Sequence, residues 1–450
     1  MFKKYFLLLV TMALAIMWVY SQKNLTTNFH HPSWSKQSNI YEVNLRQYSV
    51  SGSFIEFAKH LPRLRKMGVE ILWFMPITPI GKEGRKMTPA DLGSYYAVRD
   101  YKAVNEEFGT MNDWKELVKK AHQMGFKVIT DWVANHSALD NHWVKDHPGF
   151  YTKDSSGKFL SPFDWTDVYK LNYKNNELRD SMTEAMKYWL TETGIDGFRC
   201  DVAEEVPADF WKQCIGSLKK IKDVFMLAEG EKPWLHEAGF NATYAWTVMS
   251  MMTDLYGGKK TLVQFDSLLI HNISTFPGNA CRMFFTTNHD ENSWNGTEFE
   301  KYGEAYKSFA VFSQTMYQSI PLIYSGQEVS NKKRLKFFVK DTIDWKGYDM
   351  GPFYTLLLSL RKRNPALAVD ASYRKLKSSN EASIFAYLRE YKKHRVAVIL
   401  NLSGTAQQFT INEIGLMGKP LNIFSNKTVQ LNDKQVYNIE PWGFLLYDYR

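Results

Sequence analysis

Residues 110–132 read TMNDWKELVKKAHQMGFKVITDW, and this stretch decides the fold class. Thr110 and Asp113 have the spacing of a capping box, which predicts the start of a helix with one apolar side. Gly125 is typical of a helix end. The apolar run 127–132 follows at once and predicts a β-strand. A helix that leads directly into a strand is typical of α/β proteins.

The same order occurs earlier in the chain. Ser53 and Glu56 have the spacing of a second capping box, and Gly68 is expected to close that helix. The apolar residues 69–74 follow as a strand. Two such units in succession strengthen the α/β interpretation.

Strand-like apolar runs continue through the first 365 residues. Seven of them are clear and an eighth, at 240–246, is weaker; the seven are 40–45, 69–74, 127–132, 197–202, 225–229, 283–287 and 320–324. Eight strands, each followed by a helix, fit a (β/α)8 TIM barrel better than an open sheet. We therefore predict a barrel over residues 35–365.

Two further regions depart from the barrel pattern. The interval after the third strand is too long for one helix, and residues 137–178 predict a small inserted subdomain rich in Gly, Pro and aromatic residues. After Asn364-Pro365 the pattern becomes all-β, with strands expected at 383–390, 395–401, 407–411 and 443–449. We predict a C-terminal antiparallel β-sandwich domain over residues 366–450.

The composition excludes several classes of protein. Apolar residues make up 44% of the 450 residues, which excludes a disordered chain. The net charge of +9 comes from interspersed charges and not from a basic run, so we expect no nucleic-acid partner. Cys200, Cys214 and Cys281 form no C-x-x-C motif and are expected to be small buried apolar residues.

The N-terminus has the features of a secretory signal. Lys3 and Lys4 precede an apolar stretch from Phe6 to Val19, and residues 19–21 offer a site for a signal peptidase. The stretch is shorter than the roughly 20 residues that a membrane-spanning helix needs. We predict residues 1–21 as a signal peptide, with an uncleaved anchor as the alternative. The mature protein is then exported to a periplasm or to the medium, without stable membrane insertion.

Acidic side chains stand where several predicted strands end. Asp131, Asp201 and Glu229 end three strands, and Asp290 follows a fourth. The C-terminal ends of barrel strands meet on one face, where the active sites of such barrels lie. Carboxylates gathered on one rim are costly, because they repel one another and resist desolvation. The pattern therefore indicates an active site.

The spacing of these residues indicates a reaction. Arg199 and Asp201 share a strand face, and an Arg beside Asp201 favours the ionised carboxylate that a nucleophile requires. Glu229 follows apolar residues, which could keep a proton on it. Two carboxyl groups of opposite protonation state are what glycoside hydrolysis uses. Nearby, His136 and His289 can donate to sugar hydroxyls.

At this point the chain resembles a known family. The segments around Asp131–His136, Gly197–Asp201, Glu229 and Asn288–Asp290 are similar to the four signature regions of the α-amylase family, glycoside hydrolase family 13. Further similar stretches are 40–48, 96–101 and 320–328. The resemblance covers residues 35–365, and the C-terminal β region is similar to the trailing domain of that family.

The resemblance implies a role for each matching residue. Asp201 would be the nucleophile, Glu229 the general acid/base and Asp290 the stabiliser of the transition state. The sugar at the cleavage point would be surrounded by Asp131, His136, Arg199 and His289, with Tyr96 stacked beneath it. Tyr96 is a better match than Tyr95, because it precedes the Asp100-Tyr101 pair by four residues.

Glu231 is a rival to Glu229, because it lies two residues further along and would share a face with it. The apolar run 224–227 favours Glu229 as the acid at the strand end.

The sequence also bears on whether the protein binds calcium. Lys170 stands in a Lys-Leu-Asn string where many family members have an Asp ligand, and an ammonium group does not suit a hard cation. We therefore expect no metal and no other cofactor.

These observations predict an exported retaining hydrolase that acts on α-glucosidic bonds of starch-like α-glucans or maltooligosaccharides. One alternative is a transglycosylase or a disaccharide-specific α-glucosidase, active on substrates such as trehalose or sucrose, because such family members would use the same residues. Another is a non-catalytic carbohydrate-binding or interaction protein. That alternative is disfavoured, because all three carboxylates are present.

Overall fold

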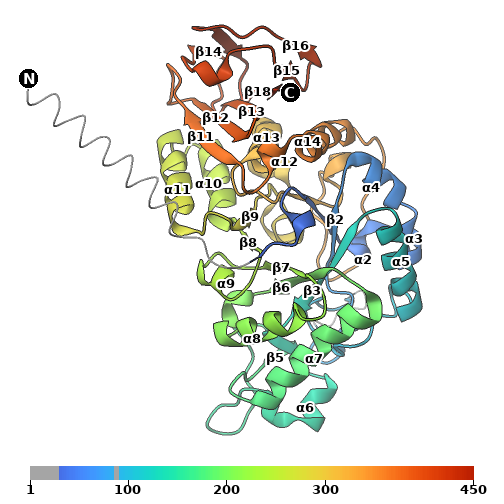
Figure 1. Ribbon diagram of the computed structural model, residues 1–450. Coiled ribbons are helices and arrows are strands. Elements are labelled where there is room, and N and C mark those ends of the chain that lie inside the picture. The colour runs from blue at the N-terminus through green and yellow to red at the C-terminus, as the bar shows by residue number, and fades with distance from the viewer. Residues whose placement is uncertain (1–29, 86–90, 450) are drawn as a thin grey trace, which may run out of the picture.

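The computed structural model describes residues 30–85 and 91–449, and its central feature is a barrel of eight parallel strands (Figure 1). The predicted signal peptide, residues 1–21, lies outside the described residues. The strands pair in the order β10-β1-β2-β3-β6-β7-β8-β9. They are β1 Ile40–Val43, β2 Ile71–Phe74, β3 Lys127–Val133, β6 Gly197–Asp201, β7 Phe225–Ala228, β8 Ala242–Tyr244, β9 Cys281–Met283 and β10 Leu322–Tyr324.

The two end strands of this sheet meet each other and close the barrel. Arg282 in β9 forms a parallel bridge with Ser319, just before β10. The Leu322 N–H then donates to the carbonyl of Phe284 at 2.9 Å. The predicted (β/α)8 barrel is therefore confirmed.

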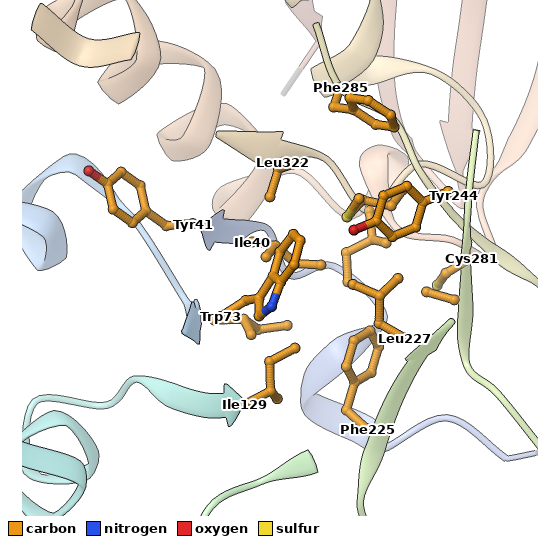
Figure 2. Close-up of a cluster of buried hydrophobic side chains, with 14 of the residues drawn as sticks. Ile40, Tyr41, Trp73, Ile129, Phe225, Leu227, Tyr244, Cys281, Phe285 and Leu322 are labelled. Atoms are coloured by element: carbon orange, nitrogen blue, oxygen red, sulfur yellow. The ribbon is translucent and has the colours of Figure 1, made fainter. Parts of the chain in front are cut away.

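Apolar side chains from the strands fill the interior of the barrel. Figure 2 shows this cluster, in which Trp73, Ile129, Leu227 and Leu322 come from four different strands. Side chains of a strand alternate between its faces, so each strand sends only every second residue inward. The polar residues that follow the strands are thereby brought to one end of the barrel.

Helices follow the strands and surround the barrel (Figure 1). The longer ones are α5 Met111–Gln123, α7 Asn176–Thr193, α8 Ala208–Leu218, α10 Trp246–Tyr256, α11 Leu262–Thr275, α13 Tyr306–Thr315 and α14 Gly351–Arg363. The shorter ones are α2 Leu45–Tyr48, α3 Phe54–Ala58, α4 Leu61–Met67, α9 Trp234–Glu237 and α12 Glu298–Tyr302. Helix α5 begins with the predicted capping box, because Thr110 and Asp113 each accept a hydrogen bond from the other's backbone N–H.

Most strand boundaries lie within two residues of the prediction, and two elements differ by more. The helix expected between Ser53 and Gly68 is two helices, α3 and α4, because Pro62 has no N–H to donate to the carbonyl of Ala58. The strand expected at 283–287 is β9, which ends at Met283. Its partner strand β8 ends at Tyr244, which pairs with Met283, and the chain then enters α10. Residues after Met283 therefore have no strand to pair with on that side.

The chain between β3 and α7 forms a small separate layer. Strand β4 (His136–Ala138) pairs antiparallel with β5 (Val168–Lys170), and helix α6 (His142–Asp146) lies between them in the sequence. Because β4 begins three residues after β3 ends, this layer stands directly above one side of the barrel rim.

A C-terminal antiparallel domain follows α14. Its six-stranded sheet has the order β11-β12-β13-β18-β15-β16, and β14 and β17 form a separate pair. The strands are β11 Ser372–Leu376, β12 Ile384–Tyr391, β13 His394–Asn401, β14 Gln407–Thr410, β15 Leu421–Asn422, β16 Lys427–Thr428, β17 Val436–Ile439 and β18 Phe444–Tyr449. Ile384 and Ala386 of β12 pack toward the β14–β17 pair, whereas Phe385 and Tyr387 belong to the core shared with the barrel.

The three cysteines are buried and free, as expected. Within residues 30–85 and 91–449, no helix is both long enough and apolar enough to cross a membrane.

Candidate active site

A cavity of about 400 Å³ opens at the C-terminal ends of the barrel strands. This volume is within the range of small-molecule sites. Its lining combines the strand ends with the inserted layer and the connections after β2, β9 and β10: Gly84, Ser94, Tyr96, His136, Asp164, Trp165, Thr166, Asp167, Val168, Asp201, Val202, Glu229, Asp290, Trp294, Phe337 and Phe338. Five of the eight predicted site residues are on this lining. The other three, Asp131, Arg199 and His289, are buried directly behind it.

Arg199 is the centre of the charge network. It lies in β6, is fully buried, and its guanidinium stands 5.1 Å from the ring centre of Trp73. Its Nη1 donates to Asp131 Oδ1 at 2.8 Å and to Asp201 Oδ1 at 3.0 Å. Its Nη2 lies 3.0 Å from Glu229 Oε1. One cation thus contacts three carboxyl groups that come from three neighbouring strands.

Asp201 and Glu229 are also close to each other: both contact Arg199, and the charge of Glu229 acts on the carboxyl group of Asp201. The other oxygen of Glu229, Oε2, accepts the backbone N–H of Val202 at 2.7 Å. Val202 has φ of +35°, which is strained for a β-branched residue. Such strain persists where the surroundings enforce it, and it is frequent at functional sites. Here the strained turn aims a backbone donor at Glu229.

The electrostatics of Asp201 differ from the prediction. Burial and the adjacent charge of Glu229 raise the pKa of Asp201 well above its usual range, although Arg199 acts in the opposite direction. Arg199 therefore does not by itself hold Asp201 ionised. The carboxyl group of Asp201 therefore keeps its proton to a higher pH than usual, because ionising it in a buried position beside Glu229 is unfavourable.

Glu231 has different neighbours. Its Oε1 pairs with Arg282 Nη2 at 2.5 Å and accepts the hydroxyl of Thr247, while its Oε2 accepts the Thr247 N–H. Glu231 is not on the cavity lining, whereas Glu229 is. Glu229 therefore faces the cavity, whereas Glu231 forms an ion pair away from its lining.

His289 joins the second half of the site. Its Nδ1 lies 2.5 Å from Glu42 Oε1, and its Nε2 lies 2.7 Å from the Tyr96 hydroxyl and 3.2 Å from Asp290 Oδ2. Burial disfavours the imidazolium form, but the charges of Asp290 and Glu42 outweigh it and raise the pKa of His289 to about 9. His289 is therefore a cation at neutral pH, and Asp290 stands beside it on the cavity wall.

Asp131 and Tyr96 connect the two halves. The Tyr96 hydroxyl lies 3.3 Å from Asp131 Oδ2, and its ring stacks on that of His289 at 5.6 Å. Burial raises the pKa of Asp131 to about 6, against the opposing charge of Arg199. Tyr95 points elsewhere, because its hydroxyl donates to Asn44 in the core. Tyr96 is therefore on the cavity lining, and Tyr95 is not.

His136 lines the cavity on the side of the inserted layer. Burial lowers the pKa of His136 to about 3, so its ring is neutral and can both donate and accept a hydrogen bond. The ring meets Trp165 edge-on at 5.2 Å.

Sequence reasoning missed several residues of the site. Glu42 faces inward from β1, and the signal was available, because it is the one acid in the apolar run 40–43. Trp294, Phe337 and Phe338 lie in barrel loops, where no periodicity marks them. All charged residues on the described lining are acidic, and none of its residues is Lys or Arg.

The region of the doubted calcium site is held by other contacts. Lys170 stands opposite His136 in the β4–β5 pair, and its Nζ lies 3.9 Å from Glu205 Oε2. Asn135 Nδ2 lies 3.3 Å from His136 Nδ1. Among the residues that the structure describes, no three His, Cys, Asp or Glu side chains are grouped so as to hold a metal ion. Independence from calcium stays a prediction.

Comparison with known proteins places this geometry in context. The profile of the family "Alpha amylase, catalytic domain" matches residues 37–162 and 149–350, and that of "Maltogenic Amylase, C-terminal domain" matches 373–446. The alpha-amylase MalA of Haloarcula japonica is 25% identical over 390 residues, which are 82% of this chain and 56% of that protein. The chain thus spans a little over half the length of that relative.

Two solved structures are similar over nearly their whole length. The maltogenic alpha-amylase AmyB of Thermotoga neapolitana aligns with a TM-score of 0.84 and 29% identity, covering 92% of this chain and 99% of that one. An alpha-amylase of Lactobacillus plantarum aligns with a TM-score of 0.81 and 28% identity, covering 93% and 100%.

Proposed function

The chain belongs to the alpha-amylase family of glycoside hydrolases, and on this premise we propose that it is an exported, retaining hydrolase of α-glucosidic bonds. Its substrates are starch-like α-glucans or maltooligosaccharides. The observation that carries the proposal is that the carboxyl groups of Asp201 and Glu229 both contact Arg199 at the wall of one cavity.

In the first step, Asp201 attacks the anomeric carbon while Glu229 protonates the departing glycosidic oxygen. This division of roles requires the negative charge on Asp201, and Arg199 contacts that carboxyl group at 3.0 Å. The product is a β-glycosyl ester of Asp201 and a free sugar hydroxyl. The carboxylate of Asp290 stands on the same wall and stabilises positive charge on the sugar ring as the bond breaks.

In the second step, water attacks the ester with Glu229 acting as the base. Two inversions at one carbon leave the configuration retained. Arg199 remains in contact with both carboxyl groups, so a cation is available to whichever of them is charged. No redox cofactor enters this chemistry.

Asp201→Asn tests the assignment. We expect loss of turnover on soluble starch with an unchanged melting curve and retained oligosaccharide binding, because the amide cannot attack but has nearly the same shape. The control is Asp344→Asn, because Asp344 is an exposed residue in a surface ion pair with Lys346. Proton NMR of the first products of the unaltered enzyme reports the stereochemistry, and initial release of the β-anomer would contradict retention.

A transglycosylase or disaccharide-specific enzyme is the second candidate, because it would use the same carboxyl groups. The acidic lining, free of Lys and Arg among its described residues, favours neutral sugars in either case. Product analysis with starch, maltotriose, trehalose and sucrose separates the candidates. Glucose or maltose from starch supports hydrolysis, and longer products from maltotriose support transfer.

Export is proposed from the sequence features of residues 1–21. We expect the mature protein to begin near residue 22, which N-terminal sequencing of the protein from the medium or the periplasm will test. An intact N-terminus in membrane fractions would support the uncleaved anchor instead.

A further inference from the structure

Exposed aromatic rings are confined to one part of the surface. Among the Phe and Trp side chains that the structure describes, the three exposed ones are Phe163 at 63%, Trp165 at 36% and Trp294 at 53%. Single exposed apolar residues are common on proteins. These three, however, are all at the active-site cavity or in ring contact with its lining.

Phe163 and Trp165 form what we call the subdomain lip. They lie in the inserted layer just before β5, with ring centres 4.9 Å apart. Trp165 also reaches His136 at the cavity wall. The backbone of Phe163 has φ of +52°, an uncommon conformation for a side chain of this size. The fold therefore holds this aromatic pair exposed despite strain.

Trp294, Phe337 and Phe338 form the loop lip. The Trp294 ring lies 5.4 Å from that of Phe337, which lies 5.0 Å from that of Phe338. Phe337 is also parallel to Tyr96, at 6.3 Å and 14°. The loop lip is thus continuous with the ring that the resemblance places beneath the reacting sugar.

The loop lip is held in place by its surroundings. Trp294 lies in a π-helical turn, η4 (Glu291–Asn295), which directly follows Asp290. In this turn Asn292 Oδ1 accepts the Leu335 N–H at 2.9 Å, and the Ser293 hydroxyl donates to the Leu335 carbonyl at 2.7 Å. π-Helical turns are rare in proteins, and those that occur often lie at functional sites. The turn that carries Trp294 is therefore held in place, while the Trp294 side chain itself stays exposed.

We propose that the two lips bind glucose rings of an α-glucan outside the position of the reacting ring, and that Trp294 is the main stacking platform. This inference rests on the proposed function. Rigid aromatic faces lose little conformational freedom on binding, and Trp is one of the residue types that most often dominate binding energy once a partner covers them. The lips thus set a preference for chains of several glucose units over single glucosides.

The test compares a long and a short substrate. In Trp294→Ala we expect kcat/KM on maltoheptaose to fall about tenfold or more, whereas kcat/KM on 4-nitrophenyl α-glucoside changes less than about twofold. Trp294→Phe should recover most of the loss, because it keeps a ring. Phe163→Ala should give a smaller loss of the same kind. The exposed Ile270 on α11, replaced by Ala, is the control.

Equal losses on both substrates, or no loss on maltoheptaose, would overturn the proposal. Binding is measured separately by calorimetry of maltoheptaose on Asp201→Asn, with and without Trp294→Ala. If Trp294→Ala weakens the affinity for maltoheptaose but the unaltered protein does not cleave glucans, the binding role of the lips is upheld and the proposed hydrolase activity is rejected. Cleavage of glucans with unchanged affinity would reject the lips alone, and no binding at all would reject both.

Discussion

Replacing Asp131 by Asn should stabilise the folded protein, although Asp131 belongs to the candidate active site. Its carboxyl group is buried, and burial raises its pKa from 3.8 to about 6 even with Arg199 at 2.8 Å. The ionised form is therefore less favourable in the folded chain than in the unfolded one. An Asn side chain can still accept the Arg199 hydrogen bond without carrying this charge.

The sign and size follow from the pKa difference. A group whose folded pKa is raised contributes stability that is present below its unfolded pKa and lost as the pH rises through the folded pKa. The difference between 3.8 and about 6 corresponds to about 3 kcal/mol at neutral pH. This penalty falls to about half at pH 5, where the folded carboxyl group is mostly protonated.

Thermal melting at two pH values measures this effect. For a chain of 450 residues, about 3 kcal/mol corresponds to a rise in Tm of about 3 °C for Asp131→Asn at pH 7.5, with a smaller rise at pH 5. Asp344→Asn should show no rise at either pH. A variant that melts below the unaltered protein at pH 7.5, or a difference in Tm that grows toward pH 5, would refute the reasoning.

Three further predictions concern the acid, the imidazolium and the metal. Glu229→Gln should lower kcat/KM on a substrate with a poor leaving group at least about a hundredfold. Glu231→Gln should chiefly lower Tm, because the buried Arg282 loses its charged partner. A larger loss of kcat/KM in Glu231→Gln than in Glu229→Gln would reverse the assignment of the acid. Activity should decline as the pH rises through about 9, because His289 then loses its proton, and a pH profile that stays flat to pH 10 would argue against this. EDTA should leave Tm unchanged; a fall that added calcium restores would reveal a site near Lys170.

Much of the fold could be predicted because its signals are local. The Thr110–Asp113 capping box and the apolar run after Gly125 each lie within a few residues, and both occur as expected. The break between α3 and α4 could also have been predicted from the sequence, because Pro62 stands four residues after Ala58. The end of β9 was not, because it depends on where its partner β8 turns away.

The candidate site divides in the same way. The spacing of Arg199 and Asp201 predicted a contact that the structure has at 3.0 Å. The protonation of Asp201 could not be predicted from that spacing, because burial and Glu229 from another strand outweigh the arginine. Trp294 was missed for a related reason. Its exposure and its place at the cavity depend on Leu335 and Phe337, about 40 residues further along the chain.

The two-sided burial of β12 restricts how this enzyme can be engineered. Phe385 and Tyr387 pack into the barrel's own core, while Ile384 and Ala386 pack toward the β14–β17 pair. A truncation before β11 would expose apolar surface on the outer helices, and such surface promotes aggregation. Replacing the C-terminal domain by that of another member of the family would succeed only if its inward side chains matched the shape of that surface. The C-terminal domain should therefore be kept with the barrel, and a shorter expression variant should be made by removing residues from another part of the chain.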